Sequence, residues 1–578
     1  MSDATAKKEE RRKFQAIRGT RDLLPPETEL WNRVEQTAHE VFSTYNFGEI
    51  RLPILEPTDL FARSIGSETD VVSKEMFSFE DHDHVDLARI RSGLLVWNLE
   101  VTQTGGVLLF PTFEDVLSFS RNVVVFADAF EALWQRGDIP RTPNNDDSRR
   151  RLSALVGEIK TKVEEFGRLR PTGMRGAKEA QLEQEMLNDL LKQLEPLVGL
   201  VHHALQTIEL GNEVTLRPEA TASVCRAYIE HNMQQLPQPV KLYYIGPMFR
   251  RERPQKGRYR QFYQIGAEVL DHVRPAEKVS SEADALLRKD AVIDAEVIEM
   301  LMTFFEKCGL TGTTLYINSI GHNGPDCRRA YMGTLYNALL KIKDRLGPDS
   351  QRRIDTNPLR VLDSKVEREQ PYIETLPHIS DHLCHDCRTH YAEVKRQLQV
   401  RGVLYQENWR LVRGLDYYMR TTFEITAPGL GSQNAVCGGG RYDGLVELLG
   451  GPPTKGIGFA IGEDRLILSL QESGKGQAQQ GRDVYIAWMG ERAYAAAIRA
   501  ARDLRNVGFS VELPPVEQKF GKALSQADKL GAKYALILGD NEVSEALWTL
   551  KTLSTGEQEK FPEPELIDFL RRQKNVSS

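Results

Sequence analysis

Residues 241–260 read Lys241-Leu-Tyr-Tyr-Ile-Gly-Pro-Met-Phe-Arg-Arg-Glu-Arg-Pro-Gln-Lys-Gly-Arg-Tyr-Arg260. Seven of these twenty residues are Lys or Arg and one is Glu, so the stretch has a net charge of +6. An apolar segment (242–249) leads into Arg250, a loop with Pro and Gly follows, and a second segment of strand character (259–270) contains Glu268. This pattern predicts two antiparallel strands joined by a basic loop. Such a pair can hold guanidinium groups over a phosphate while the loop reaches the end of a nucleic acid.

The charge of this stretch contrasts with that of the whole chain. The 578 residues include 75 Lys or Arg and 82 Asp or Glu, which gives a formal net charge of −7. Because like charges at close range repel, a local field of this kind calls for an anionic partner or for acidic neighbours. A run of charge alone is most often a solvated surface. The strand–loop–strand pattern is the feature that favours an anionic ligand here.

Length and composition limit the class of protein. At about 150 residues per domain, 578 residues predict three to four domains. The 40% hydrophobic and 27% charged residues are typical of a globular protein and exclude disordered and collagen-like chains. No run approaches the ~18 apolar residues of a membrane span, and the first residues lack the apolar core of a secretion signal. Six Cys make no disulfide framework. We therefore expect a cytoplasmic, enzyme-sized protein with no membrane segment.

A long region interrupts the first block of the chain. Residues 1–81 contain an amphipathic helical stretch at 30–42 and a segment of strand character at 49–55. Residues 82–213 then form an inserted region. Two sets of apolar residues recur in it at helical spacing: Leu152, Leu155, Val156, Ile159, Val163 and Phe166, and Leu182, Met186, Leu190, Leu194 and Leu197. The turn composition of residues 170–176 predicts that the two stretches form an antiparallel helical hairpin.

The remaining chain divides by composition. Aromatic strands and Gly-rich turns mark one core unit at 214–308 and 409–471, with a partly helical excursion at 309–408 between them. Residues 472–482 have the composition of a linker. Strands at 483–488, 509–513 and 534–538 then alternate with helices at 493–506 and 522–530. This alternation predicts a separate α/β domain at 483–578 with a mainly parallel sheet.

Five motifs in order resemble one enzyme family. Residues 249–268 resemble the second motif of the class II aminoacyl-tRNA synthetases, in the form found in the histidyl-tRNA synthetases. Residues 411–424 (Leu-Val-Arg-Gly-Leu-Asp-Tyr-Tyr-Met-Arg-Thr-Thr-Phe-Glu) and 435–445 (Ala-Val-Cys-Gly-Gly-Gly-Arg-Tyr-Asp-Gly-Leu) narrow the resemblance to that family. Residues 456–466 resemble the third class II motif. The segment around Pro53 resembles the first, which in this class makes the dimer interface.

The resemblance implies a fold, a reaction and partners. The fold is an α+β catalytic domain with an antiparallel sheet of class II type, followed by a C-terminal α/β anticodon-binding domain. The reaction is ATP-dependent ligation of L-histidine to its cognate tRNA through a histidyl-adenylate, with release of AMP and pyrophosphate. ATP is a substrate, Mg²⁺ is expected with the pyrophosphate oxygens, and the protein is expected to be a homodimer.

The resemblance also assigns roles to residues. Arg250 matches the arginine that contacts the α-phosphate and the substrate carboxylate, Arg413 the one that stabilises the pentavalent phosphorus, and Arg465 the one on the γ-phosphate. Arginine suits these places because its fork stays charged and grips oxygens in pairs. We expect Arg250, Arg258 and Arg465 to bind ATP. The histidine pocket is expected to comprise Glu219, Thr221, Arg250, Gln264, Glu268, Arg413, Tyr417, Tyr418 and Tyr442.

Recognition of histidine and of tRNA follows from the same motifs. An imidazole needs a hydrogen-bond acceptor and a donor on opposite edges, and Glu268 and Tyr418 match the residues that supply them. Histidine tRNA has an extra 5′ guanosine, and the basic loop lies where Gln255 and Arg258 could contact it and the acceptor phosphates. For Gln255 an ordinary solvated loop is the alternative. In the C-terminal domain the basic helix start at 519–522 suits phosphate contacts.

The cysteines and a paralogous role leave alternatives open. Cys384 and Cys387 form one Cys-x-x-Cys pair with three His nearby, and Cys327 lies upstream. A structural zinc needs four ligands, so a helix start with buried thiols is the favoured interpretation and no metal is predicted. The alternative function is a non-catalytic histidine-binding paralog, such as a regulatory subunit of ATP phosphoribosyltransferase. Such relatives lack the anticodon domain and typically lose catalytic arginines.

Overall fold

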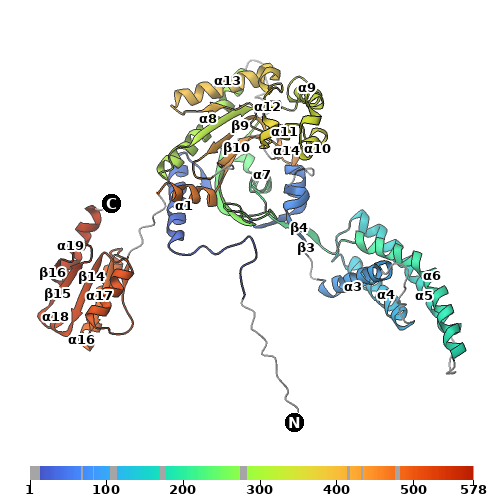
Figure 1. Cartoon of the computed structure of the whole chain (residues 1–578), viewed down its shortest axis with the longest axis horizontal. Helices are drawn as coiled ribbons and strands as arrows, with labels where there is room; N and C mark the ends of the chain where they lie inside the picture. The colour runs from blue at the N-terminus through green and yellow to red at the C-terminus, as the bar shows by residue number, and fades with distance from the viewer. Residues whose placement is uncertain are drawn as a thin grey trace, which may run out of the picture.

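The computed structural model describes residues 14–66, 69, 71–81, 84–103, 113–169, 177–273, 283–412, 415, 417–430, 434–474 and 482–576. Its centre is an eight-stranded sheet with the strand order β1-β5-β6-β11-β10-β9-β7-β8 (Figure 1). The strands are β1 (Gly48–Glu49), β5 (Val240–Phe249), β6 (Gln261–His272), β7 (Thr314–Ser319), β8 (Gln406–Glu407), β9 (Met419–Thr426), β10 (Ala435–Arg441) and β11 (Thr454–Gly462). All central pairs are antiparallel, and only the edge pairs β1·β5 and β7·β8 are parallel. The predicted antiparallel sheet is confirmed.

Strand alternation gives the sheet two different faces. Successive side chains of a strand point to opposite sides. In β6, Ile265, Ala267 and Val269 belong to the main apolar core, so Gln264 and Glu268 face the other side. Four helices contribute to that core: α1 (Glu27–Thr44), α8 (Ala283–Lys307), α13 (His385–Val400) and α15 (Glu463–Glu472). The opposite face carries a second cluster with α7 (Thr221–Glu230) and α14 (Leu445–Leu448).

The predicted strand at 49–55 is wrong in its middle. β1 ends at Glu49 and β2 (Leu55–Pro57) begins at Leu55, with no strand between them. Pro53 has no N–H to donate to a ladder. Nη1 of Arg217 instead donates hydrogen bonds to the carbonyl oxygens of Leu52, at 3.0 Å, and Pro53, at 3.3 Å. A short helix, α2 (Thr58–Ile65), follows β2.

The region after residue 81 is more helical than a single hairpin. β3 (Phe77–Asp81) and β4 (Asn212–Leu216) pair antiparallel and form a small sheet with β2. Four helices lie between β3 and β4: α3 (Val85–Gln103), α4 (Phe113–Arg136), α5 (Pro143–Leu169) and α6 (Ala177–Thr207). The two predicted apolar stretches lie in α5 and α6. The helices share an apolar cluster of residues from Leu87 to Leu210 and stand apart from the large sheet (Figure 1).

The excursion between β7 and β8 forms an apolar cluster of its own. Its helices are α9 (Arg328–Lys341), α10 (Pro348–Thr356), α11 (Leu359–Leu362), α12 (Gln370–Ile373) and the start of α13. Cys327, Tyr331, Leu383 and Cys387 are buried in this cluster together with Tyr418. The excursion therefore packs directly against a residue expected in the histidine pocket.

The C-terminal unit has the predicted alternation of strands and helices. The elements are β12 (Val484–Met489), α16 (Glu491–Asn506), β13 (Val511–Glu512), α17 (Phe520–Lys529), β14 (Tyr534–Gly539), α18 (Asp540–Glu545), β15 (Leu547–Thr552), β16 (Gln558–Pro562) and α19 (Glu563–Val576). β12 is parallel to β13 and β14, but β15 and β16 are antiparallel. The sheet is therefore mixed rather than mainly parallel, because a terminal hairpin adds two strands at one edge. No described helix has both the length and the apolarity to cross a membrane.

Candidate active site

A cavity of ≈ 360 Å³ lies where β5, β6, β9, β10 and β11 meet α7 and the start of α15. A cavity of this size holds a small polar ligand. Eight of the predicted site residues line it: Glu219, Thr221, Arg250, Arg258, Gln264, Tyr417, Tyr418 and Arg465. They come from segments almost 250 residues apart in the chain. The sheet therefore brings together most of the residues that the sequence motifs single out.

Glu268 and Tyr442 lie one layer below the cavity wall. Glu268 is 1% exposed, and both of its oxygens accept hydrogen bonds, from the Thr221 hydroxyl at 2.7 Å and the Tyr442 hydroxyl at 2.5 Å. Glycine at 458, directly opposite on β11, makes room for the carboxylate, since a Cβ there would collide with it. Thr221 lines the cavity and connects it to this carboxylate.

Burial changes the ionisation of Glu268. It raises the pKa of Glu268 to about 8, although the hydrogen bonds from Tyr442 and Thr221 act in the opposite direction. A carboxyl with a raised folded-state pKa stabilises the fold below its ordinary pKa, and this contribution is lost as pH rises through the folded value. The ligand-free chain should therefore lose stability from about pH 5 to about pH 8.

A Glu268→Gln variant tests this titration. We expect its urea midpoint to fall less steeply between about pH 5 and about pH 8 than that of the parent, because the variant removes the titrating group. Glu393→Gln is the matched control: a hydrogen bond from Arg396 lowers the pKa of Glu393 to about 2, so its charge is constant over this range. Equal slopes in Glu268→Gln and the parent would contradict the assignment.

Glu219 shapes the turn that begins α7. Its carboxylate accepts the backbone N–H groups of Thr221 at 2.6 Å and Ala222 at 3.0 Å. Burial raises the pKa of Glu219, and these hydrogen bonds oppose the shift. Ala220, between them, has φ −113°, so its methyl group causes no backbone strain. Glu219 therefore satisfies the helix N-terminus from the floor of the cavity.

Two buried oxygens in the cavity wall lack hydrogen-bond partners within the described part of the chain: Oε1 of Gln264 and the hydroxyl of Tyr244. A buried polar atom without a partner is costly unless a ligand satisfies it. Gln264 was expected in the pocket from the sequence. Tyr244 was missed. Alternation is the signal for it: Tyr244 pairs with Gly266, and Gly246, two residues further along the same face of β5, pairs with Gln264.

Three arginines line the same cavity: Arg250, Arg258 and Arg465. Nε of Arg250 donates to the carbonyl of Pro218 at 3.0 Å, and its guanidinium lies 5.4 Å from the centre of the Phe262 ring. Arg465 donates to the carbonyl of Ala435 at 2.8 Å. Burial lowers the pKa of Arg465, and the charge of Arg258 lowers it further. Two guanidinium groups that repel each other in a partly buried wall favour an anion between them.

Two predicted residues lie away from the cavity or outside the described part. Gln255 is exposed at the tip of a turn in which its backbone pairs with Arg258, and Gly257 has φ +74° there. Lys256 at the same tip forms an ion pair with Glu472 at 3.0 Å. Arg413 lies outside the described residues.

The predicted helix start at Cys384 is confirmed. α13 begins at His385, and Cys384 is its N-cap, where its sulfur accepts the backbone N–H of Cys387 at 3.5 Å. Cys327 and Cys387 are buried. The structure adds His322, which lies five residues before Cys327 and was not predicted to face these cysteines.

Comparisons with known proteins agree with this geometry. Residues 204–458 match the family model of the tRNA synthetase class II core domain (G, H, P, S and T), and residues 483–573 match that of the anticodon binding domain. A histidine–tRNA ligase of Koribacter versatilis is 42% identical over 558 residues, which cover 96% of each chain. One of Solibacter usitatus is 41% identical over 96% of this chain and 98% of the relative.

A solved structure supports the same assignment. The chain superimposes on the apo histidyl-tRNA synthetase of S. aureus with a TM-score of 0.59 and 28% sequence identity, over 97% of this chain and 100% of that one. The curated relatives match over nearly the whole chain, including both the core and the C-terminal unit. The chain therefore belongs to the histidine–tRNA ligase family of class II aminoacyl-tRNA synthetases.

Proposed function

We propose that the chain ligates L-histidine to its cognate tRNA in two steps, through a histidyl-adenylate. The observation that carries this proposal is the layout of one cavity. Thr221 connects the cavity to the buried Glu268, and Arg250, Arg258 and Arg465 line the same cavity. One cavity therefore offers both polar groups for an amino acid and positive charge for a triphosphate.

In the first step a histidine carboxylate oxygen attacks the α-phosphorus of ATP, and pyrophosphate leaves. The chain itself makes no covalent bond; it aligns the carboxylate and neutralises charge on the phosphates. Arg250 touches the α-phosphate and the carboxylate, Arg413 the phosphorus at which charge develops, and Arg465 the γ-phosphate. In the second step a hydroxyl of the terminal ribose attacks the histidyl carbonyl, and AMP leaves.

Histidine specificity follows from the polar groups in and behind the cavity wall around Thr221. Glu268 accepts a hydrogen bond from one imidazole nitrogen once the Thr221 side chain, which covers it in the structure, turns aside on binding. The Tyr418 hydroxyl donates to the other nitrogen. Tyr417 lines the pocket beside the ring, and Tyr442 packs edge-to-face against Tyr417 from behind, with ring centres 5.7 Å apart. Glu219, Thr221 and the unpartnered Oε1 of Gln264 receive the α-amino group. An amino acid without a matching ring would leave these buried groups unsatisfied, which is costly.

Mg²⁺ fits the part of the cavity that Arg465 lines. Mg²⁺ prefers carboxylate oxygens together with substrate phosphates, and the cavity wall beside Arg465 contains Glu252 and Glu424. These two residues would hold the ion. When bound, it neutralises charge on the pyrophosphate as that group leaves. In the structure the Glu252 carboxylate accepts a hydrogen bond from Nη1 of Arg258 at 3.0 Å.

The tRNA and a second subunit are further parts of the proposal. The exposed turn with Gln255 and Lys256 lies beside the cavity and suits the acceptor end, with Arg258 below it. α17 begins next to Lys519, which suits contacts to phosphates around the anticodon. Ile54 and Leu55 are 43% and 50% exposed in the segment that resembles the dimer motif. These exposed apolar side chains support the homodimer that the resemblance implies, and a cytoplasmic location is part of the same proposal.

A charging assay tests the proposal. We expect the purified chain to attach histidine to a transcript of histidine tRNA, and to charge a transcript without the extra 5′ guanosine more slowly. A non-catalytic histidine-binding paralog would bind histidine without charging either transcript. The match of residues 483–573 to an anticodon binding domain favours the ligase, because the paralogs lack that domain.

The helices α3–α6 should be dispensable for activation of histidine. In the described part of the chain, their apolar cluster contains only residues between Leu87 and Leu210. β3 ends at Asp81, which pairs with Asn212 at the start of β4, so a short turn can join the two strands. Deleting residues 86–211 and inserting a short Gly-containing turn should therefore leave histidine-dependent ATP–pyrophosphate exchange within a few-fold of the parent.

The deletion must be compared with the parent for folding and oligomeric state. Circular dichroism and gel filtration provide these controls. A folded, dimeric deletion variant that no longer activates histidine would show that the inserted helices support the amino-acid pocket.

A further inference from the structure

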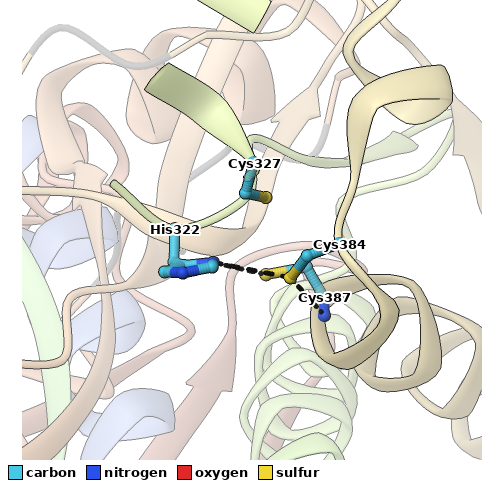
Figure 2. A group of neighbouring side chains, drawn as sticks. All are labelled: His322, Cys327, Cys384 and Cys387. Atoms are coloured by element: carbon cyan, nitrogen blue, oxygen red, sulfur yellow. Dashed lines mark hydrogen bonds between the residues drawn. The ribbon is translucent and has the colours of Figure 1, made fainter. Parts of the chain in front are cut away.

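Four metal-ligating side chains meet at the end of β7 and the start of α13. They are His322, Cys327, Cys384 and Cys387, and Figure 2 shows all four side chains converging on a common point. One ligand atom from each lies within 4.8 Å of the other three. The first two residues come from the loop between β7 and α9, and the other two from the N-terminus of α13. The cluster is separate from the cavity that contains the arginines.

The two distances from His322 to the cysteines of α13 match those of a tetrahedral zinc site. With Zn–S of about 2.3 Å and Zn–N of about 2.0–2.1 Å, a tetrahedron places its nitrogen about 3.6 Å from each sulfur. Nδ1 of His322 lies 3.4 Å from Sγ of Cys387 and 3.6 Å from Sγ of Cys384. Three Cys and one His are a ligand set typical of structural zinc and unsuited to Mg²⁺ or Ca²⁺, which prefer oxygen.

The backbone is shaped to hold this geometry. Cys384 is the N-cap of α13, and its sulfur accepts the N–H of Cys387. On the other side Gly321 has φ +62°, and a Cβ there would lie 2.6 Å from Sγ of Cys327. Glycine thus allows the loop to approach the sulfur closely.

A neighbouring carboxylate completes the surroundings. Nε2 of His322, the nitrogen that faces away from the sulfurs, lies 3.9 Å from Oδ1 of Asp326. An acidic group beside the second ring nitrogen favours the tautomer whose Nδ1 is free to bind metal. Ser364, by contrast, donates to Glu369 at 2.5 Å and takes no part in the cluster.

We propose that His322, Cys327, Cys384 and Cys387 bind one structural Zn²⁺, with protein ligands in all four positions. Binding releases the thiol protons to solvent, and the metal–sulfur bonds join the loop after β7 to α13. A site closed by four protein ligands has no position for substrate, so the ion would stabilise the fold and perform no chemistry.

The site has a structural link to the histidine pocket. Arg328, which follows Cys327, donates from Nη1 to the carbonyl oxygen of Tyr418 at 2.6 Å. Tyr418 packs in the same apolar cluster as Cys327 and Cys387. The metal would therefore hold the segment that presents Tyr418 to the cavity.

Metal analysis of the full chain tests the proposal. Protein produced with added zinc and then desalted should contain about one zinc per chain. Cys384→Ala and His322→Ala should each lower this to below roughly a tenth of an equivalent, since three ligands hold the ion poorly. Cys308→Ala is the matched control, because Cys308 packs against the main core instead; it should retain about one equivalent.

A second measurement uses the unaltered sequence, in case a variant fails to fold. Adding Co²⁺ to the reduced, metal-stripped chain should produce the visible absorption of tetrahedral cobalt and a thiolate charge-transfer band, and Zn²⁺ should displace both. Stripped protein should also unfold at a lower temperature, with recovery on addition of Zn²⁺ but not of Mg²⁺. Absence of zinc together with absence of the cobalt bands would overturn the proposal. So would zinc that persists in both variants.

Discussion

Replacing Arg250 by glutamine is expected to lower histidine-dependent ATP–pyrophosphate exchange by about 10²–10³-fold, the loss typical when one donor to a developing charge is removed. The reason is its position. Arg250 lines the cavity together with Gln264 and Arg465. Its contacts with the Pro218 carbonyl and the Phe262 ring fix the direction of its guanidinium. A guanidinium held in this way can bind carboxylate and phosphate oxygens together. Arg250→Lys should restore only part of the rate, because lysine keeps the charge but not the fork.

Arg251 provides the matched control. It is the next residue and carries the same charge, but it is exposed, and its guanidinium lies 5.4 Å from the centre of the Phe77 ring, outside the cavity wall. Arg251→Gln should leave exchange within a few-fold of the parent. Equal losses in Arg250→Gln and Arg251→Gln would mean that the general positive charge of the loop, and not the position of Arg250, supports the reaction.

The largest expected effect on stability belongs to Arg441. Its side chain is 2% exposed at the end of β10 and donates to Asp294, to Asp443 at 2.8 Å and to the carbonyl of Asp290 at 3.1 Å. Burial tends to lower its pKa, but the three carboxylates raise it well above the ordinary value. The guanidinium is therefore charged, and it is the cation that pairs with the buried Asp294.

Charges around Arg441 balance. Lys455 pairs with Asp290 at 2.7 Å, and Arg420 lies 3.7 Å from the same carboxylate. His390 stands 3.4 Å from Asp294, but it adds no charge. Burial lowers the pKa of His390 to about 3, and the charges of Arg441 and Arg420 add to this shift. Removing the guanidinium leaves Asp294 buried without a cation.

Arg441→Met should therefore destabilise the fold by about 3–5 kcal/mol, the cost of breaking a buried ion pair on one side. Urea unfolding recorded by circular dichroism measures the change. Arg396→Met removes an exposed arginine that pairs with Glu393 and should leave the midpoint unchanged. A shift for Arg441→Met as small as that of the control would contradict the network.

The sequence predicted those parts of the fold that depend on local pattern. The strand pair around the basic loop and the first amphipathic helix were correct because alternation and helical spacing are local signals. The prediction of a strand at 49–55 was wrong because Arg217, more than 160 residues away, donates hydrogen bonds to the carbonyls of Leu52 and Pro53. The hairpin β15–β16 was missed because the alternation of strands and helices over residues 483–538, which predicts parallel strands, was extended to the whole unit.

The candidate site was predictable where motifs are long. Eight expected residues line one cavity, but sequence could not show that Glu268 lies a layer below the wall, since this depends on glycine at 458 across the sheet. Tyr244 and His322 were missed for the same reason. Each gains its role only from a neighbour on another strand or helix, which a single sequence does not display.

The measurement that tests the central claim most directly is amino-acid-dependent ATP–pyrophosphate exchange with the purified full chain, run separately with all twenty amino acids. We expect exchange with histidine alone, because Thr221 and Tyr418 line the cavity and Thr221 connects it to the buried Glu268. Exchange with a different amino acid, or none from a folded chain that still binds histidine, would contradict it.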